Sequence, residues 1–189
     1  MRVVLLGVAI AGLVVRCAAL PTPDWSVSEW LSVPEAAVLS PDCRDLKRGV
    51  HRAADGTSWF SGRVVNTQEV RSARWSVTGL GVFDVYVNGR RVGTDFLKPG
   101  FTHVVKTRVA FAYDVTDLLR TAAGAQNVFA AEVSAGWWRD KIVNFAGRKS
   151  AFRGVLELTY ADGTTERFGT KASDWRCGIA GPVTHAGIY

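Results

Sequence analysis

The chain has 189 residues, of which 48% are hydrophobic and 21% charged, as expected for one globular domain with a proper core. These values exclude a disordered chain and a pair of large domains. The formal net charge is +6, but the basic residues are scattered along the chain. This excludes the concentrated basic stripe of a nucleic-acid-binding protein.

The N-terminus has the pattern of a secretory signal peptide. Met1-Arg2 supplies a positive charge, and residues 3–15 form an apolar run. A helix of that length rises only about 20 Å, too short for a hydrocarbon core of about 30 Å. Small residues at Cys17 and Ala19 predict cleavage after Ala19 and export to the periplasm or the cell exterior. Arg16 is unusual in such a region, and an N-terminal anchor is the alternative.

Two cysteines, Cys43 and Cys177, follow the predicted cleavage site. In an oxidising compartment they would allow one disulfide that joins the two ends of the domain. Two free buried thiols are the alternative, because the sequence does not give the Cα separation that a disulfide requires. No C-x-x-C spacing indicates a metal or redox site.

Residues 20–56 are predicted to form an irregular lead-in segment without regular secondary structure. Prolines 21, 23, 34 and 41 interrupt any helix or strand in this segment. Trp25 and Trp30 are its candidates for contact with the main body.

From Thr57 onwards, apolar residues recur with the period of two that is typical of β-strands. Residues 71–78 and 82–87 alternate apolar and polar side chains. Asn88-Gly89 then supplies the residue pair of a type I′ hairpin turn, before a return strand over residues 90–92. Further strands are predicted at residues 103–113, 127–134, 152–160 and 165–170, with a turn at 161–163.

Residues 113–120 differ, because Asp114 can cap a short helical turn that folds Leu118 and Leu119 onto the core. No helical stretch is long enough for the crossovers of a parallel sheet. At least seven short strands with closely spaced turns therefore predict an all-β fold, an antiparallel β-sandwich or jelly roll over residues 57–189. Its core is expected to contain Trp59, Trp75 and Trp175.

A series of motifs continues this pattern in a definite order. The motifs are GLGVFDVYVNGRRVG at 79–93, LKPGFT at 97–102, YDVTDLL at 113–119, GWW at 136–138, YADGT at 160–164 and GPV at 181–183. In this order they resemble the N-terminal domain of bacterial α-L-rhamnosidases, although the hairpin and YDVTDLL motifs also occur in jelly-roll domains of β-galactosidases. The resemblance implies an exported, galactose-binding-like jelly roll attached to an enzyme that removes terminal rhamnose from glycans or glycosides.

In such enzymes, two carboxyl groups in a helical (α/α)6 barrel carry the inverting reaction. One protonates the leaving oxygen and the other activates a water molecule on the opposite face of the sugar. The sequence ends at Tyr189, before such a barrel, so the resemblance implies a truncated, non-catalytic accessory domain. A stand-alone secreted carbohydrate-binding module and a purely structural sandwich are the alternatives.

The segment GWWRD at 136–140 is the candidate contact site. If the strand from Asn127 continued to Trp138, the two indoles would point to opposite faces, one into the core and one outward. An outward indole offers a flat apolar surface to a sugar or to another domain. Trp137, Trp138, Arg139 and Asp140 are therefore candidates for contact with a rhamnose-containing glycan or a catalytic domain, with pure packing as the alternative.

The remaining residues predict no catalytic site, cofactor or metal. His51, His103 and His185 are far apart and lack the spacing of a metal-binding helix. Asp84 and Asp95 flank one hairpin, where carboxylates usually keep a sheet edge soluble. Asn88-Gly89 is expected to serve only the turn.

Overall fold

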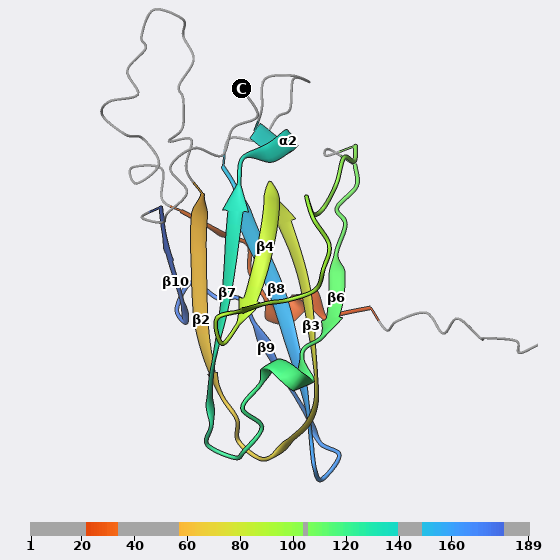
Figure 1. Ribbon diagram of the computed structural model, residues 1–189, viewed down its shortest axis with the longest axis vertical. Helices are drawn as coiled ribbons and strands as arrows, with labels where there is room; N and C mark the ends of the chain where they lie inside the picture. The colour runs from red at the N-terminus through yellow and green to blue at the C-terminus, as the bar shows by residue number, and fades with distance from the viewer. Residues whose placement is uncertain (1–21, 34–56, 104–105, 140–148, 180–189) are drawn as a thin grey trace, which may run out of the picture.

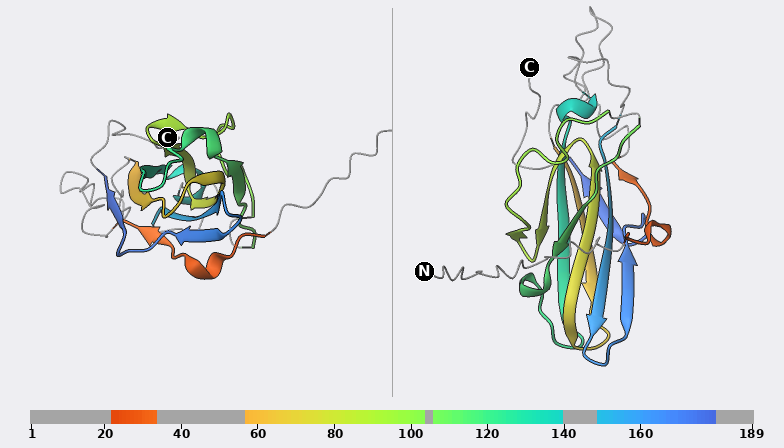
Figure 2. Two further views of the ribbon diagram at one scale, coloured as in Figure 1. Left: turned by 90° about the horizontal axis from the view of Figure 1, so that it is seen from below. Right: turned by 90° about the vertical axis from the view of Figure 1, so that its right-hand side faces the viewer.

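The computed structural model describes residues 22–33, 57–103, 106–139 and 149–179, and the account below concerns these residues. They form two antiparallel sheets that pack face to face (Figures 1 and 2). The predicted all-β antiparallel sandwich is therefore confirmed. Within the described ranges, no helix has the length and apolar character needed to cross a membrane.

Sheet A is built around one long pair of strands, β3 and β8. Its order is β1 (Leu31–Ser32), β8 (Ala151–Tyr160), β3 (Val70–Leu80) and β6 (Phe111–Asp114), and β9 (Thr165–Gly169) also pairs with β8. In the β3–β8 ladder, Trp75 lies opposite Leu156. Both side chains are buried and face the second sheet.

Sheet B has β7 at its centre. Its order is β10 (Trp175–Gly178), β2 (Ser58–Val65), β7 (Gln126–Ser134), β4 (Val82–Val87) and β5 (Arg90–Arg91). The alternation predicted for residues 82–87 is confirmed, because Phe83, Val85 and Val87 are all buried. The strand β10 was not predicted, because no clear alternation marks its four residues.

The core lies between the inner faces of the two sheets. Trp75 from sheet A meets Phe129 from sheet B edge to face, with ring centroids 5.0 Å apart. Trp75 is 1% exposed, so its predicted core position is confirmed. Trp175, the first residue of β10, is half-buried and packs on Phe152 of sheet A, with ring centroids 5.8 Å apart.

Trp59 does not belong to the core, contrary to the prediction. It alternates with the buried Phe60 along β2 and therefore points to the outer face of sheet B. There it stacks on Tyr86, with ring centroids 6.2 Å apart. Composition alone suggested burial, but the register of β2 decides the direction of the side chain.

The lead-in segment has more regular structure than predicted. Residues Trp25–Val27 form the 3-10 turn η1, and Leu31–Ser32 form β1 at the edge of β8. Arg153 explains why this short segment is fixed, because its guanidinium donates to Ser28 Oγ at 2.9 Å and to the Ser28 carbonyl oxygen at 2.8 Å. These contacts cross from one end of the sequence to the other, so local propensity does not reveal them.

The strand predicted over residues 103–113 is much shorter in the structure, where β6 begins at Phe111. The amides of Lys106 and Thr107 both donate to the His103 carbonyl oxygen, at 2.8 and 2.9 Å, which forms a turn. Closer to β6, Thr78 Oγ1 donates to the Val109 carbonyl oxygen at 2.9 Å. A side chain of β3 thus holds the segment just before β6 in place, although this segment does not pair with β3 as a continuous strand.

All three predicted turns are present in the structure, and the third, at residues 161–163, has Gly163 at φ +86°. Asn88 and Gly89 have φ angles of +50° and +80°, as the type I′ hairpin requires. Asp114 Oδ1 accepts from the Thr116 amide at 2.9 Å, just before the 3-10 turn η4 (Thr116–Leu118). The Thr116 hydroxyl donates to the same oxygen at 2.6 Å. The two hydrogen bonds, that of the hydroxyl first, hold the pKa of Asp114 below its usual value.

Asn88 has a second role that the sequence did not predict. Its side-chain amide donates to Asn127 Oδ1 at 2.8 Å, and Asn127 Nδ2 donates to Asn66 Oδ1 at 3.1 Å. Asn66 and Asn127 are each 1% exposed. This asparagine cluster also bonds both backbone groups of Arg120, so it fixes the loop between η4 and β7.

Candidate functional site

The candidate site lies at the end of the sandwich where β7 stops. The strand ends at Ser134, as predicted, and does not run on to Trp138; the helical turn α2 (Gly136–Arg139) follows (Figure 1). Gly136 has φ +44°, and a Cβ atom there would lie 2.5 Å from Val82 Cγ2. The glycine therefore permits both the turn and the close approach of β4.

Because the two tryptophans lie on a helical turn, they do not point to opposite faces of a sheet. Both Trp137 and Trp138 are half-buried. The Trp138 indole N–H donates to the Lys149 carbonyl oxygen at 2.8 Å. The Arg108 guanidinium lies over the Trp138 ring, 5.0 Å from its centroid. Trp138 therefore packs α2 against two neighbouring segments.

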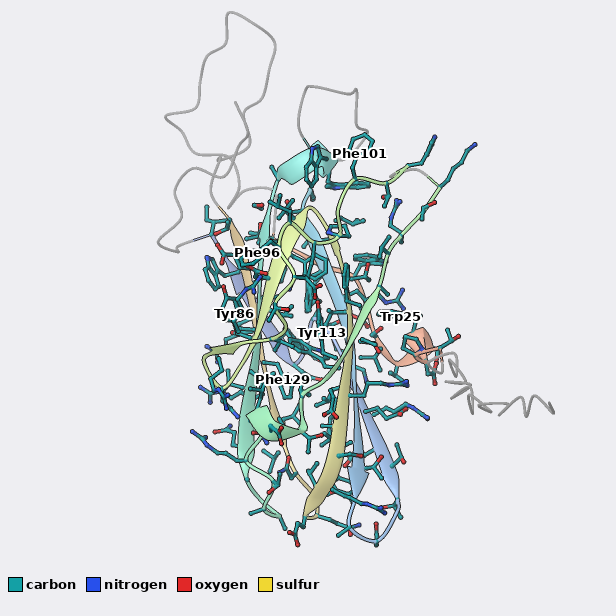
Figure 3. The ribbon with its side chains drawn as sticks, turned by 45° about the vertical axis from the view of Figure 1, so that its right-hand side comes forward. Trp25, Tyr86, Phe96, Phe101, Tyr113 and Phe129 are labelled. Atoms are coloured by element: carbon teal, nitrogen blue, oxygen red, sulfur yellow. The ribbon has the colours of Figure 1, made fainter. Side chains whose placement is uncertain are left out.

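Trp137 contacts a different part of the chain. Its ring meets Phe101 edge to face, with centroids 6.3 Å apart and an interplanar angle of 89°. Phe101 is 63% exposed, and Figure 3 places it beside α2 at the end of the molecule. The pair combines a half-buried indole with a solvent-exposed phenyl ring.

The two indoles line a shallow pocket together with segments from β3 and from the β5–β6 connection. We call it the apical pocket; its lining consists of Gly79, Leu80, Gly81, Pro99, Gly100, Thr102, Thr107, Arg108, Val109, Trp137 and Trp138. It therefore offers two indoles, two hydroxyls and one guanidinium. These groups suit the apolar face and the hydroxyls of a sugar, or a small projection of another protein domain.

A run of exposed apolar side chains approaches the apical pocket from the outer face of sheet B. Phe96, Leu97 and Phe101 are 82%, 61% and 63% exposed. We call residues 96–101 the apolar arm. Figure 3 shows Phe96 beside sheet B and Phe101 at the apex, so the arm connects the two places. The sequence carried no signal for this exposure, because LKPGFT has no alternation that indicates which of its side chains face solvent.

The arm is fixed at its base by an ionic cluster around Asp84. Arg91 Nη2 donates to Asp84 Oδ1 at 2.8 Å, and Lys98 Nζ lies 3.2 Å from the same oxygen. Tyr113 donates its hydroxyl hydrogen bond to Asp95 Oδ2 at 3.2 Å. Asp84 and Asp95 thus organise the arm, beyond the expected role of keeping the hairpin edge soluble.

Burial is the main reason why the pKa of Tyr113 lies far above its usual value, and the hydrogen bond to Asp95 and the charge of that carboxylate add to the effect. The pKa of Tyr86 is also raised, by burial first and by the charges of Glu132 and Asp84. Both phenols therefore stay neutral hydrogen-bond donors at physiological pH.

The other predicted site residues are only partly described. Arg139 is the last residue of α2, but its side chain lies outside the described part of the structure, as do Asp140, His51 and His185. Cys177 is an exposed residue of β10, which contradicts the alternative of two buried thiols. Cys43 lies outside the described residues, so the disulfide stays a prediction.

Among the residues that the structure describes, no three His, Cys, Asp or Glu side chains are grouped to hold a metal ion. His103 takes part in the turn before β6 through its carbonyl oxygen.

Comparison with known proteins identifies the family. The family model of the α-L-rhamnosidase N-terminal domain matches residues 68–189. An α-L-rhamnosidase of Streptomyces avermitilis is 39% identical over 125 residues, which are 64% of this chain and 12% of that enzyme. One from Formosa agariphila is 32% identical over 180 residues, which are 90% of this chain and 18% of the enzyme.

Solved structures agree with this relationship. The crystal structure of the Streptomyces avermitilis α-L-rhamnosidase complexed with L-rhamnose superposes with a TM-score of 0.64 and 34% identity, covering 72% of this chain and 13% of that one. The Aspergillus terreus α-L-rhamnosidase gives a TM-score of 0.64 at 25% identity, covering 73% of this chain and 16% of that one. The chain thus spans less than a fifth of the length of these enzymes. By sequence motifs, fold and family model, it belongs to the α-L-rhamnosidase N-terminal domain family.

Proposed function

We propose that the chain is a non-catalytic accessory domain of an α-L-rhamnosidase-like glycoside hydrolase, and that the apolar arm packs against the catalytic part of such an enzyme. The exposure of the arm carries this proposal: Phe96, Leu97 and Phe101 are 82%, 61% and 63% exposed within six residues. Large apolar side chains gathered in this way mark an interaction surface. Aromatic residues are also the usual anchors of protein interfaces.

The state of several carboxylates supports a non-catalytic role. Glu157 contacts Arg74 and Arg167, with N–O distances of 3.5 and 2.8 Å, and Asp84 is held by Arg91 and Lys98. An inverting hydrolase needs a free base and a protonated acid that face each other across a gap wide enough for water. Carboxylates held in ion pairs are poorly suited to either task.

The docking proposal is tested by adding the full chain to the Streptomyces avermitilis enzyme from which the matching segment has been deleted. We expect a complex in sedimentation velocity, and we expect Phe101→Ser to weaken it about tenfold because a central aromatic contact is lost. Val65→Ser removes another exposed apolar side chain, 51% exposed at the far end of β2, and serves as the matched control. Equal binding by both variants would contradict docking through the arm.

A hydrolysis assay tests the non-catalytic role directly. We expect the purified chain to release no nitrophenol from p-nitrophenyl α-L-rhamnoside above the buffer rate. The same assay with the deleted enzyme plus the chain reports whether docking restores turnover. Turnover by the chain alone would refute the accessory role.

The apical pocket supports a second candidate function, recognition of a rhamnose-containing glycan. Trp137 and Thr102 both line the pocket and combine an apolar surface with a hydroxyl. This function predicts saturable heat on titration with L-rhamnose, lost in Trp137→Ala while the circular dichroism spectrum is unchanged. Flat titrations would favour the docking function alone.

We also propose that the chain is exported and that its first 19 residues are removed as a signal peptide, which lies outside the described residues. The proposal rests on the charged start, the apolar run and the small residues before the cleavage point. N-terminal sequencing of the secreted product should begin at Leu20. Thiol titration of that product, with and without a reductant, then tests the pairing of Cys43 with Cys177.

A further inference from the structure

A cleft opens between the inner faces of the two sheets, at the edge where the chain crosses from β9 to β10. Its volume is about 190 Å³. An engineered cavity of about 150 Å³ in another protein holds benzene, so this cleft has room for one six-membered ring with a small substituent. The apolar part of its lining consists of Val27, Val64, Trp75, Phe129, Leu156, Phe168 and Trp175.

Two glycines on the inner faces of the sheets leave room for the cleft. Gly154 of β8 lies between Phe152 and Leu156, which both face the core, and it contributes no side chain on that face. Gly62 of β2 lies opposite Trp175 of β10, and a Cβ atom at Gly62 would lie 2.4 Å from the Trp175 ring. The indole therefore covers the backbone of Gly62 and forms one wall of the cleft.

The segment that crosses between the sheets is held in place by backbone hydrogen bonds. The Thr170 amide donates to the Gly154 carbonyl oxygen at 3.0 Å. The amides of Asp174 and Trp175 both donate to the Lys171 carbonyl oxygen, at 3.1 and 3.0 Å. The rim of the cleft is therefore preformed, which lowers the entropy cost of binding a ligand.

The charged side chains that line the cleft have a net positive charge. They are Arg63, Arg167 and Lys171, against Asp174. Arg167 is paired with Glu157, with 2.8 Å between Nε and Oε2. Among the residues that the structure describes, neither Arg63 nor Lys171 forms an ion pair. Both are exposed, so the mouth of an apolar cleft carries two cations without an anion.

We propose that this inter-sheet cleft binds a small organic anion that consists of one apolar ring and one carboxylate. The ring lies among the apolar walls, and the carboxylate lies at the mouth, where it pairs with Arg63 and Lys171. Such a ligand buries no charge, because its carboxylate and the two cations stay in contact with solvent. The cleft shares no residue with the apical pocket or the apolar arm, so this site does not depend on the proposed function.

Three probes separate the contributions of the ring and the charge. Benzoate has both, benzamide has nearly the same shape without the charge, and acetate has the charge without the ring. Each is titrated into the full chain while the tryptophan indole N–H resonances are followed by NMR, which suits the affinity of about 1 mM expected for such small molecules. We expect saturable binding of benzoate, with shifts of the Trp75 and Trp175 resonances. Affinity for benzamide should be about fivefold lower, because ion pairs at exposed positions are weak, and acetate should not saturate over the same range.

Charge variants test the pairing at the mouth of the cleft. Lys171→Gln and Arg63→Gln should each weaken benzoate binding about twofold and leave benzamide binding unchanged. Asp174→Asn removes the negative charge of the lining and should strengthen benzoate binding by a similar factor. Arg176→Gln is the matched control, because Arg176 is exposed, directly follows Trp175 and does not line the cleft. Higher ionic strength should reduce all these differences, because salt screens exposed charges.

A further pair of variants locates the ring. Val64→Trp fills the cleft and should abolish benzoate binding, whereas Val65→Trp adds the same bulk at the neighbouring, 51% exposed position and should not. If Val64→Trp does not fold, the variants of the exposed residues Arg63, Lys171 and Asp174 still test the site.

Several results would each overturn the proposal. Absence of saturable benzoate binding would mean that solvent alone occupies the cleft. Equal affinity for benzoate and benzamide, or equal effects of Lys171→Gln and Arg176→Gln, would show that the two cations do not select the ligand. Acetate binding as tight as that of benzoate would show that the apolar walls contribute nothing. Benzoate binding that survives Val64→Trp, or that shifts only the Trp137 and Trp138 resonances, would place the ligand elsewhere.

Discussion

Lys98 Nζ lies 3.2 Å from Asp84 Oδ1, although the Lys98 side chain is 1% exposed. The contact is an ion pair whose angle does not suit a hydrogen bond, so Nζ lacks a hydrogen-bond partner among the described residues. The ammonium group also lies 5.4 Å from the Tyr113 ring centroid and 5.8 Å from that of Phe83. A buried cation is thus stabilised by one carboxylate and two rings at the base of the apolar arm.

Asp84→Asn should lower the free energy of unfolding by about 2 kcal/mol, because it leaves the Lys98 charge buried without its anion. This value is below that of a fully buried pair, since the Asp84 side chain is 34% exposed. Lys98→Met should cost less, because it removes the buried charge and keeps most of the volume. Urea unfolding of both variants, with the exposed Asp117→Asn as control, provides the measurement. A loss in Asp84→Asn no larger than in Asp117→Asn would contradict this account.

Asn127→Ala should destabilise the fold by about 3 kcal/mol, because it leaves several buried polar groups unpaired. Asn127 Oδ1 accepts from Asn88 and from the Arg120 amide, each at 2.8 Å, and Nδ2 donates to Asn66 at 3.1 Å. Gln126→Ala changes the exposed neighbour and should have an effect below about 0.5 kcal/mol. Thermal unfolding of the two variants compares them. Similar midpoints would show that the asparagine cluster is dispensable.

The raised pKa of Tyr113 predicts a loss of stability at alkaline pH. In the unfolded chain the phenol ionises near its ordinary pKa of 10.0, whereas burial and Asp95 keep it protonated in the folded chain. The unfolded state therefore binds fewer protons above that pH, and stability decreases as the pH rises. Tyr113→Phe should make this decrease less steep, with the remainder due to Tyr86 and Tyr160, whose pKa values are also raised. Denaturant unfolding at several alkaline pH values measures the slope, and an unchanged slope would exclude Tyr113 as a contributor.

Trp138 and Phe101 should respond differently to truncation. Trp138→Ala removes a hydrogen bond to the Lys149 carbonyl oxygen and the ring beneath Arg108, so we expect a loss of about 2 kcal/mol. Phe101→Ser changes a 63% exposed ring and should alter stability by less than about 0.5 kcal/mol. Chemical unfolding followed by circular dichroism tests both. A large loss of stability in Phe101→Ser would mean that this ring stabilises the fold, which would argue against a role in binding a partner.

The sequence alone determined the sandwich, most of its strands, its predicted turns and the family. Alternating apolar residues at 82–87 and the Asn88-Gly89 pair are local signals, and local backbone geometry follows from them directly. The turn after Asp114 was predicted for the same reason, because its acceptor contact reaches only to Thr116, although Val115 and not Asp114 is the N-cap residue of η4. The order of the motifs indicated the family, because each motif forms a turn or a strand of this fold and these elements follow one another in a fixed order.

Only the tertiary structure decided which side chains face solvent and which residues meet. Trp59 faces outward because of the register of β2, and the tryptophan pair lies on a helical turn because Gly136 allows β4 to approach. Lys98 is buried by residues that are distant in sequence, among them Phe83 and Tyr113. Such features depend on contacts between segments that are far apart in the chain. These contacts produce no periodic pattern in the sequence of either segment, so the sequence alone does not reveal them.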